Sequence, residues 1–179
     1  MVDKKSINSN SDNHSEPGAK PGIEGVIIKE LKAIPDERGF LMEMVRKDDE
    51  IFGEFGQVYI TSTKKGVAKA WHFHKNQDDI FVCVRGTALV AMYDTREDSP
   101  TKGVAQGIVT NDPTIEGPHL AIKIPRGVMH GYCARDCEEA WIVNTVSQPY
   151  NYESPDELRK AWNDASIPFN WPKDITTGG

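Results

Sequence analysis

The sequence lacks several features that would assign it to a broad class of proteins. No apolar run approaches the roughly 20 residues that span a bilayer, and the first residues have no apolar core of the kind that a signal peptide carries. With 21 basic and 27 acidic residues and a net charge of -6, the chain has no basic stripe that could neutralise a nucleic-acid backbone. We therefore expect a cytoplasmic protein without membrane or nucleic-acid partners, whose pocket could still hold a single nucleotide.

Cysteine is scarce as well. Cys83, Cys133 and Cys137 are odd in number and show no C-x-x-C spacing, which argues against a disulfide framework and against a structural zinc knot. Reduced thiols in a core or on strands are the expectation. A chain of 179 residues with 38% hydrophobic residues can build one core but hardly two, so a single domain is expected.

The start of the chain differs in composition from the rest. Residues 1–22 are rich in Ser, Asn, Asp, Lys, Pro and Gly, and such a segment cannot bury enough apolar surface to offset the entropy of ordering. We expect a disordered tail over residues 1–22 and one folded domain over residues 23–179.

Short segments rich in Val, Ile, Phe, Tyr and Thr follow one another from Ile23 onward, with glycines between them. Many short strands without alternating helices predict an all-β sandwich or barrel. The expected strands cover residues 26–31, 40–45, 58–63, 80–84, 88–93, 120–124 and 140–145.

One helix is expected near the end of the chain, over residues 154–164. Ser154, Pro155 and Glu157 match a capping box with proline at the first helical position. Leu158 and Trp162 supply an apolar face behind it.

The histidines carry the most specific chemical signal. His72 and His74 are two residues apart, so on a strand both side chains project from one face, with Trp71 and Phe73 on the other. Two imidazoles on one face form half of a metal site. Asp79 follows after a short turn, where a returning strand could bring its carboxylate back to them.

These residues resemble the two motifs of the cupin superfamily. Gly66, His72, His74 and Gly86 fit the first motif, with Asp79 in place of its glutamate, and the segment 125–130, which ends at His130, fits the second. The resemblance implies a divalent ion, Mn, Fe, Ni or Zn, for which imidazole and carboxylate ligands are suitable. Its ligands would be His72, His74, Asp79 and His130. The alternative is a polar pocket without a metal.

Almost the whole chain beyond the tail also resembles the dTDP-4-dehydrorhamnose 3,5-epimerase family, itself a cupin-type jelly roll. The resemblance is carried by residues 36–40, 94–103, 124–131, 162–164 and 171–172, together with Glu43, Gln57 and the strand that holds His72. It implies an isomerase that moves a proton at a carbon beside the ketone of a nucleotide-linked sugar. It also implies a homodimer, since the edge strands of a jelly roll must be covered, and we expect residues 26–31 to lie across the partner.

The same resemblance assigns roles to single residues. His72 matches the base that abstracts the proton, and Asp164 matches the carboxylate that pairs with it. The substrate-binding positions are Arg38, Glu43, Gln57, His130 and, where the family has arginine, Lys69.

The chain departs from the family at positions that the family's reaction uses. The tyrosine that returns the proton should fall near Ile142, the family's lysine near the enolate is Asp79, and a glutamine after the base is His74. Isoleucine has no proton to donate, and an anion disfavours both an enolate and a pyrophosphate. A metal on His72 would also occupy the lone pair that a base needs, so the two mechanisms compete for this residue.

Three functions remain open. The first is a sugar-nucleotide epimerase or isomerase whose active site has diverged, and we expect an enzyme of this kind. The second is a metal-dependent cupin of another reaction type, an oxygenase or a lyase. The third is a non-catalytic sugar-binding protein. Because general acid catalysis is typically worth about 10²–10⁴-fold, Ile142 predicts a poor 3,5-epimerase.

Overall fold

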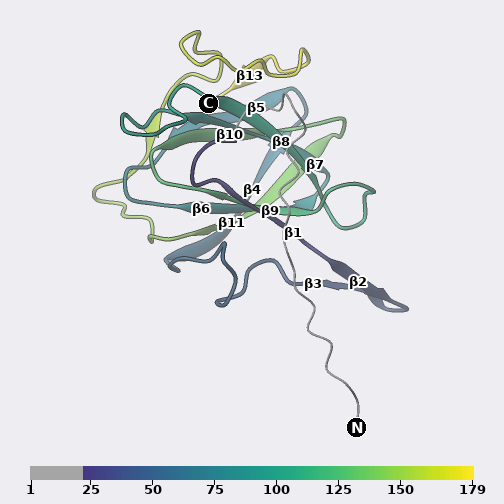
Figure 1. Ribbon diagram of the computed structural model, residues 1–179. Coiled ribbons are helices and arrows are strands. Elements are labelled where there is room, and N and C mark those ends of the chain that lie inside the picture. Colours follow the sequence, from purple (N-terminus) through teal and green to yellow (C-terminus); the bar gives the residue numbers. More distant parts are fainter. Residues whose placement is uncertain (1–21) are drawn as a thin grey trace.

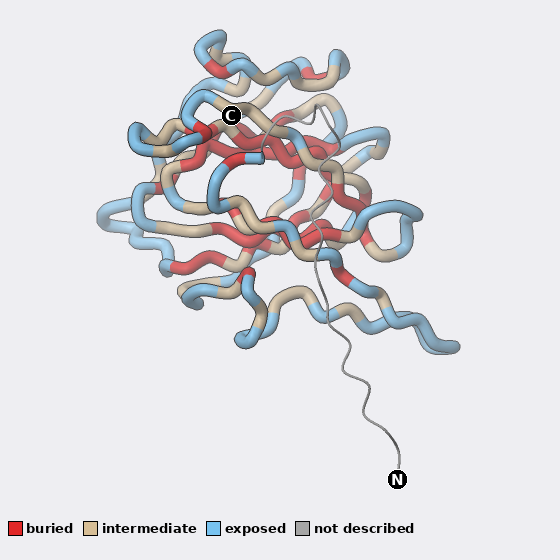
Figure 2. The backbone as a smooth tube through the Cα atoms, viewed as in Figure 1, coloured by how far each residue is buried: buried red, intermediate tan, exposed pale blue. Residues whose placement is uncertain are grey.

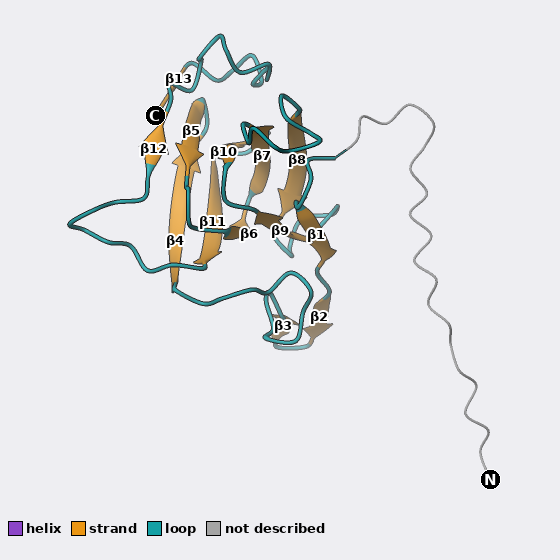
Figure 3. Cartoon of the chain, turned by 60° about the vertical axis from the view of Figure 1, so that its left-hand side comes forward, coloured by secondary structure: helices purple, strands orange, loops and turns teal. Residues whose placement is uncertain are grey.

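The computed structural model describes residues 22–179, which form two facing β-sheets with a hairpin projecting from them (Figure 1). Apart from Gly22, the predicted tail lies outside the described residues. The predicted all-β jelly roll is confirmed. The part of the chain that the structure describes contains no helix, and hence none that could cross a membrane (Figure 3).

The first sheet has five strands in the order β1-β9-β6-β11-β4. All neighbours in it are antiparallel, and β1 and β4 are its edges. The strands are β1 (Ile27–Glu30), β4 (Gln57–Lys64), β6 (Asp79–Arg85), β9 (Leu120–Ile124) and β11 (Glu139–Val146).

The second sheet has the order β12-β5-β10-β7-β8, with a short strand β13 that runs parallel to β5. A separate hairpin of β2 and β3 lies between β1 and β4 in the chain. The strands are β5 (Val67–Phe73), β7 (Thr87–Asp94), β8 (Ala105–Asn111), β10 (Val128–Ala134), β12 (Leu158–Arg159), β13 (Thr177–Gly178), β2 (Ala33–Asp36) and β3 (Gly39–Met42).

The main core lies between the two sheets, where the buried segments of Figure 2 gather. Strand alternation sends every second residue inward, as β11 shows with buried Ala140, Ile142 and Val146. Full burial of such a side chain is worth about 1.5–3 kcal/mol. The outer face of the second sheet is covered by the C-terminal segment, whose Phe169 and Trp171 pack on Trp71. The three cysteines are free.

The predicted helix over residues 154–164 is wrong. Lys160 instead exchanges two backbone hydrogen bonds with Trp71, of 3.0 and 3.1 Å, and extends the pairing of β12 with β5. A capping box would turn the Glu157 carboxylate back to the backbone of Ser154. It instead accepts a hydrogen bond from Arg159 and lies against His72. A short helix is marginal in water, whereas the edge of β5 offers this segment backbone partners, so tertiary pairing overrides the local pattern.

Candidate active site

A cavity of about 850 Å³ lies between the sheets and takes side chains from both. This volume is within the range of small-molecule sites, about 300–1,000 Å³. The predicted site residues that line it are Gln57, Lys69, His72, His74 and His130. His72 and His74 face the cavity while Trp71 and Phe73 pack on the outside of the sheet, as predicted from strand periodicity.

Lys69 shares the cavity face with His72 although they are three residues apart. The register of β5 against β10 shifts between His130 and Gly131, and this irregularity turns both side chains to one side. Gly131 is required for the close approach, because a Cβ there would lie 2.3 Å from the Cβ of Ala70.

Four predicted residues, Arg38, Glu43, Asp79 and Asp164, do not line the cavity. Arg38 and Glu43 flank β3 on the projecting hairpin, where their ion-pair partners are Asp36, Glu37 and Arg46. The Asp164 carboxylate accepts hydrogen bonds from the backbone and hydroxyl of Ser166, of 2.8 and 2.6 Å, beside a different depression. The predicted pair of Asp164 with His72 is therefore not formed, because residues 164–166 close a local turn around this side chain.

Glu157 is the carboxylate at His72, with 3.0 Å between Oε1 and Nδ1. Burial lowers the pKa of His72, although the hydrogen bond to Glu157 acts in the opposite direction. Burial also acts to raise the pKa of Glu157, but hydrogen bonds from Arg159 and His72 outweigh it and bring that pKa below its usual value. A neutral imidazole thus donates its Nδ1 hydrogen to a carboxylate, which leaves a lone pair on Nε2.

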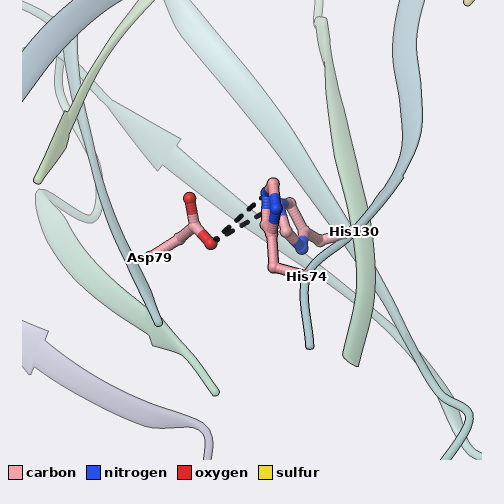
Figure 4. A group of neighbouring side chains, drawn as sticks. All are labelled: His74, Asp79 and His130. Atoms are coloured by element: carbon pink, nitrogen blue, oxygen red, sulfur yellow. Dashed lines mark ion pairs between the residues drawn. The ribbon is translucent and has the colours of Figure 1, made fainter. Parts of the chain in front are cut away.

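His74, Asp79 and His130 form a second, buried group, in which one ligand atom from each residue lies within 4.8 Å of the others (Figure 4). Asp79 Oδ2 is 3.8 Å from Nε2 of His74 and 3.9 Å from Nε2 of His130. Burial lowers the pKa of His130 to about 4. His72 is not a member of this group, so the structure gathers three of the four predicted metal ligands.

Two tyrosines complete the cavity wall. The Tyr59 hydroxyl accepts a hydrogen bond of 2.8 Å from Asn144, and the Tyr132 hydroxyl donates one of 3.2 Å to Thr61, which also accepts one from Lys69. Burial raises the pKa of each phenol to about 12. Both therefore remain protonated at neutral pH.

Comparison with known proteins assigns the chain to a family. The family model described as dTDP-4-dehydrorhamnose 3,5-epimerase matches residues 20–178. The chain belongs to this epimerase family. Its fold is similar to the crystal structure of a dTDP sugar isomerase from Desulfovibrio desulfuricans, with a TM-score of 0.75 and 29% identity over 83% of this chain and 92% of that one.

Two relatives of this epimerase-family chain have names that refer to carbohydrate biosynthesis. The spore coat polysaccharide biosynthesis protein SpsL of Bacillus subtilis is 40% identical over 83% of this chain and 96% of its own length. The probable low-salt glycan biosynthesis epimerase Agl13 of Haloferax volcanii is 37% identical over 87% of this chain and 98% of its own length.

The position expected for the family's catalytic tyrosine faces the core and not the cavity. Ile142 is fully buried in the main cluster, and the residues of β11 that reach the cavity are Asn144 and Val146. Strand alternation predicts that Ile142 and Asn144 share a face of β11. It does not show where along that face the packed core ends and the cavity begins. Glu157 was missed because its local sequence favours a helix cap.

Proposed function

We propose that this member of the epimerase family abstracts a proton from the carbon beside the ketone of a nucleotide-linked sugar. The observation that carries the proposal is the His72–Glu157 pair in the wall of the cavity. The carboxylate fixes the tautomer of the imidazole, so that Nε2 is the ring nitrogen able to accept a proton. Glu157 takes the part that the resemblance had given to Asp164.

The reaction then has two proton transfers. The C–H bond beside the ketone breaks, its proton moves to Nε2 of His72, and its electron pair forms an enolate with the ketone. A proton delivered to the opposite face of the same carbon completes the inversion. Tyr59 on β4 belongs to the sheet opposite β5, which carries His72, and this placement suits an acid on the far side of the substrate.

Tyr59 is a better candidate for this acid than Tyr132. The Tyr132 hydroxyl already donates its hydrogen to Thr61, whereas the Tyr59 hydroxyl accepts from Asn144 and has no protein acceptor for its hydrogen among residues 22–179. Nonetheless its pKa of about 12 makes it a weak acid. With Ile142 in the core, we keep the prediction that the chain is a poor 3,5-epimerase.

The cavity also suits the nucleotide part of such a substrate. Lys69 and Arg159 supply cations for a pyrophosphate. Tyr150 and Tyr152, whose rings lie 4.9 Å apart, are exposed at the cavity and offer an aromatic surface for a base. With the names of SpsL and Agl13, these features support a sugar nucleotide that feeds the synthesis of a polysaccharide or glycan.

A homodimer is part of the proposal. The first sheet has two edge strands that invite pairing with another chain: β1, within the predicted contact of residues 26–31, and the eight-residue β4, which exposes Val58 and Ile60. The projecting hairpin also exposes Phe40 and Leu41. Light scattering should give about twice the 20.0 kDa mass of one chain, and a monomer at micromolar concentration would contradict the dimer.

The group of His74, Asp79 and His130 favours a second candidate, a metal-dependent cupin of another reaction type such as an oxygenase or a lyase. Proton exchange separates the two candidates. With dTDP-4-dehydrorhamnose in D₂O, an epimerase of this kind incorporates deuterium at a carbon that flanks the ketone. We expect exchange at one carbon and little at the other, because the return step is impaired.

The outcomes of this experiment differ in meaning. Exchange at both carbons at rates typical of enzymes, about 1–10³ per second, with the inverted sugar formed as fast, would show a competent 3,5-epimerase and contradict the impaired return step. No exchange at either carbon, with the ligand shown to bind, would contradict the proposed function and favour a binding protein or another chemistry.

A further inference from the structure

Three possible ligand atoms meet in the buried group of His74, Asp79 and His130. Nδ1 of His74 lies 2.5 Å from the carbonyl oxygen of Asp156, and Nδ1 of His130 lies 3.1 Å from that of Val128. A backbone carbonyl can only accept, so each Nδ1 carries a hydrogen and each Nε2 is the ring nitrogen turned to the inside of the group. Both Nε2 atoms point toward one carboxylate oxygen of Asp79 (Figure 4).

Asp79 is held so that this one oxygen remains for the histidines. Its Oδ1 accepts hydrogen bonds from Asn144 at 2.7 Å and from Gln77 at 3.2 Å. Its Oδ2 faces the imidazoles at 3.8 and 3.9 Å, which is beyond hydrogen-bond range. The side chain is 1% exposed, and a buried carboxylate is costly unless a positive charge pairs with it.

The distances from Asp79 Oδ2 to the two Nε2 atoms suit a shared metal ion better than a shared proton. Two ligand atoms that each lie about 2.0–2.2 Å from a metal are about 3–4 Å apart, and Oδ2 stands at this distance from both Nε2 atoms. A carbonyl that holds the far nitrogen of an imidazole is also the usual support of a metal-binding histidine. The distances between the three ligand atoms and the hydrogen bonds from Nδ1 to the carbonyls thus both favour a metal ion.

We propose that His74, Asp79 and His130 bind a divalent transition-metal ion and that His72 is not a ligand. Two imidazoles and one carboxylate suit Mn²⁺, Fe²⁺, Ni²⁺ or Zn²⁺ and not Mg²⁺, which prefers oxygen ligands. His74 and His130 line the cavity, so the open coordination positions face the substrate. The base and the metal site then do not compete for His72. Its Nδ1 is paired with Glu157, and the other three residues hold the ion.

The role of the ion rests on the proposed function. Asp79 stands where the epimerase family has lysine, and a bound ion would supply the positive charge that the lysine supplies elsewhere, by polarising the ketone oxygen. The site itself does not depend on this role, since its evidence is the arrangement of the three side chains.

Metal binding by the full chain without a histidine tag tests the site. The protein is stripped with a chelator and titrated with Mn²⁺ or Zn²⁺, and bound metal is measured by elemental analysis and calorimetry. We expect about one ion per chain. His74→Gln and Asp79→Asn should weaken binding by at least about 100-fold, since loss of even an outer support costs about 10–100-fold.

His72→Asn is the matched control within the cavity, and His119→Gln is the control outside it. Both should keep the stoichiometry and affinity of the wild type. In the Mn²⁺ form, electron spin echo spectra should show two coordinated imidazole nitrogens and not three. If Asp79→Asn does not fold, as judged by circular dichroism of the stripped protein, His74→Gln and the spectra carry the test.

Several results would overturn the site. They are well under one ion per chain after reconstitution, unchanged affinity in folded His74→Gln, or loss of the ion in His72→Asn. Deuterium exchange by a protein that binds no ion would leave the proposed function in place and remove the metal. Ion binding without deuterium exchange would leave the metal site in place and contradict the proposed function.

Discussion

His72 and His74 make the most informative comparison in the molecule. They lie two residues apart, His72 near the end of β5 and His74 directly after it, and both line the same cavity. Two consecutive residues of another segment hold them: the Glu157 carboxylate is at Nδ1 of His72, and the Asp156 carbonyl is at Nδ1 of His74. The difference between a charged and a neutral acceptor separates the two histidines.

A carboxylate at Nδ1 stabilises the imidazolium that forms when Nε2 takes a proton, whereas a carbonyl only orients the ring. His74 is also the more buried, with 10% of its side chain exposed against 23% for His72. The comparison indicates that residue type and strand face predict where a histidine lies, while the partner of its second nitrogen decides its chemistry. The following substitutions test this distinction from the largest expected effect to the smallest.

His72→Asn should have the largest effect on catalysis. Removal of a general base typically costs about 10²–10⁴-fold, so deuterium exchange at the carbon beside the ketone should fall by about that factor. Metal content should be unchanged. Exchange within a few-fold of the wild-type rate would show that another group is the base.

Glu157→Gln should slow exchange by about 10–10²-fold. The effect should be smaller than the ~10⁴-fold loss at a fully buried triad carboxylate, because Glu157 is partly exposed and shared with Arg159. A positioning role predicts a fall in kcat with little change in KM. Asp164→Asn is the control and should stay within about twofold, since Asp164 contacts Ser166 and Lys160; the opposite ranking of the two variants would restore Asp164 as the partner of His72.

Tyr59→Phe should separate exchange from inversion. If Tyr59 returns the proton, the variant should retain exchange through His72 while the inverted sugar forms about 10-fold more slowly, a modest loss for an acid whose pKa is about 12. Tyr132→Phe should change neither rate appreciably, because its hydroxyl hydrogen is used by Thr61. Equal effects of the two substitutions would contradict the assignment.

Asp156→Ala should have the smallest effect and should act on stability. The Asp156 carboxylate accepts hydrogen bonds from the backbone N–H groups of Lys75 and Asn76, of 3.0 and 2.7 Å, and so fixes the turn after His74. Their loss at a partly exposed site should lower the free energy of unfolding by about 1 kcal/mol, or the melting temperature by about 2–4 °C. The carbonyl at His74 is retained, so a large loss of metal affinity would be unexpected.

The sequence predicted much of the fold for a physical reason. Strand periodicity and turn glycines are local, and they located β1, β4, β6, β7, β9 and β11 within a few residues. The predicted helix over residues 154–164 is wrong because a capping box reports only on neighbouring residues. The backbone partners of Lys160 lie on Trp71, far away in the sequence.

For the candidate site too, the sequence predicted what depends on neighbouring residues and not what depends on distant ones. The shared face of His72 and His74 followed from the period of a strand, and their motif spacing led to Asp79 and His130. The partner of His72 did not follow, because no pattern within residues 154–160 shows that Glu157 meets β5. The division of four predicted ligands into a group of three and a separate base likewise depends on distances across the barrel.

The central claim is that the base and the metal ligands are separate, and a crystal structure of the Mn²⁺-reconstituted protein tests it most directly. Anomalous scattering should show one ion about 2.0–2.3 Å from His74 Nε2, Asp79 Oδ2 and His130 Nε2. His72 should remain paired with Glu157 through Nδ1, with its Nε2 outside the coordination sphere. An ion bound to Nε2 of His72, or no ion among the three residues at saturating Mn²⁺, would contradict the account.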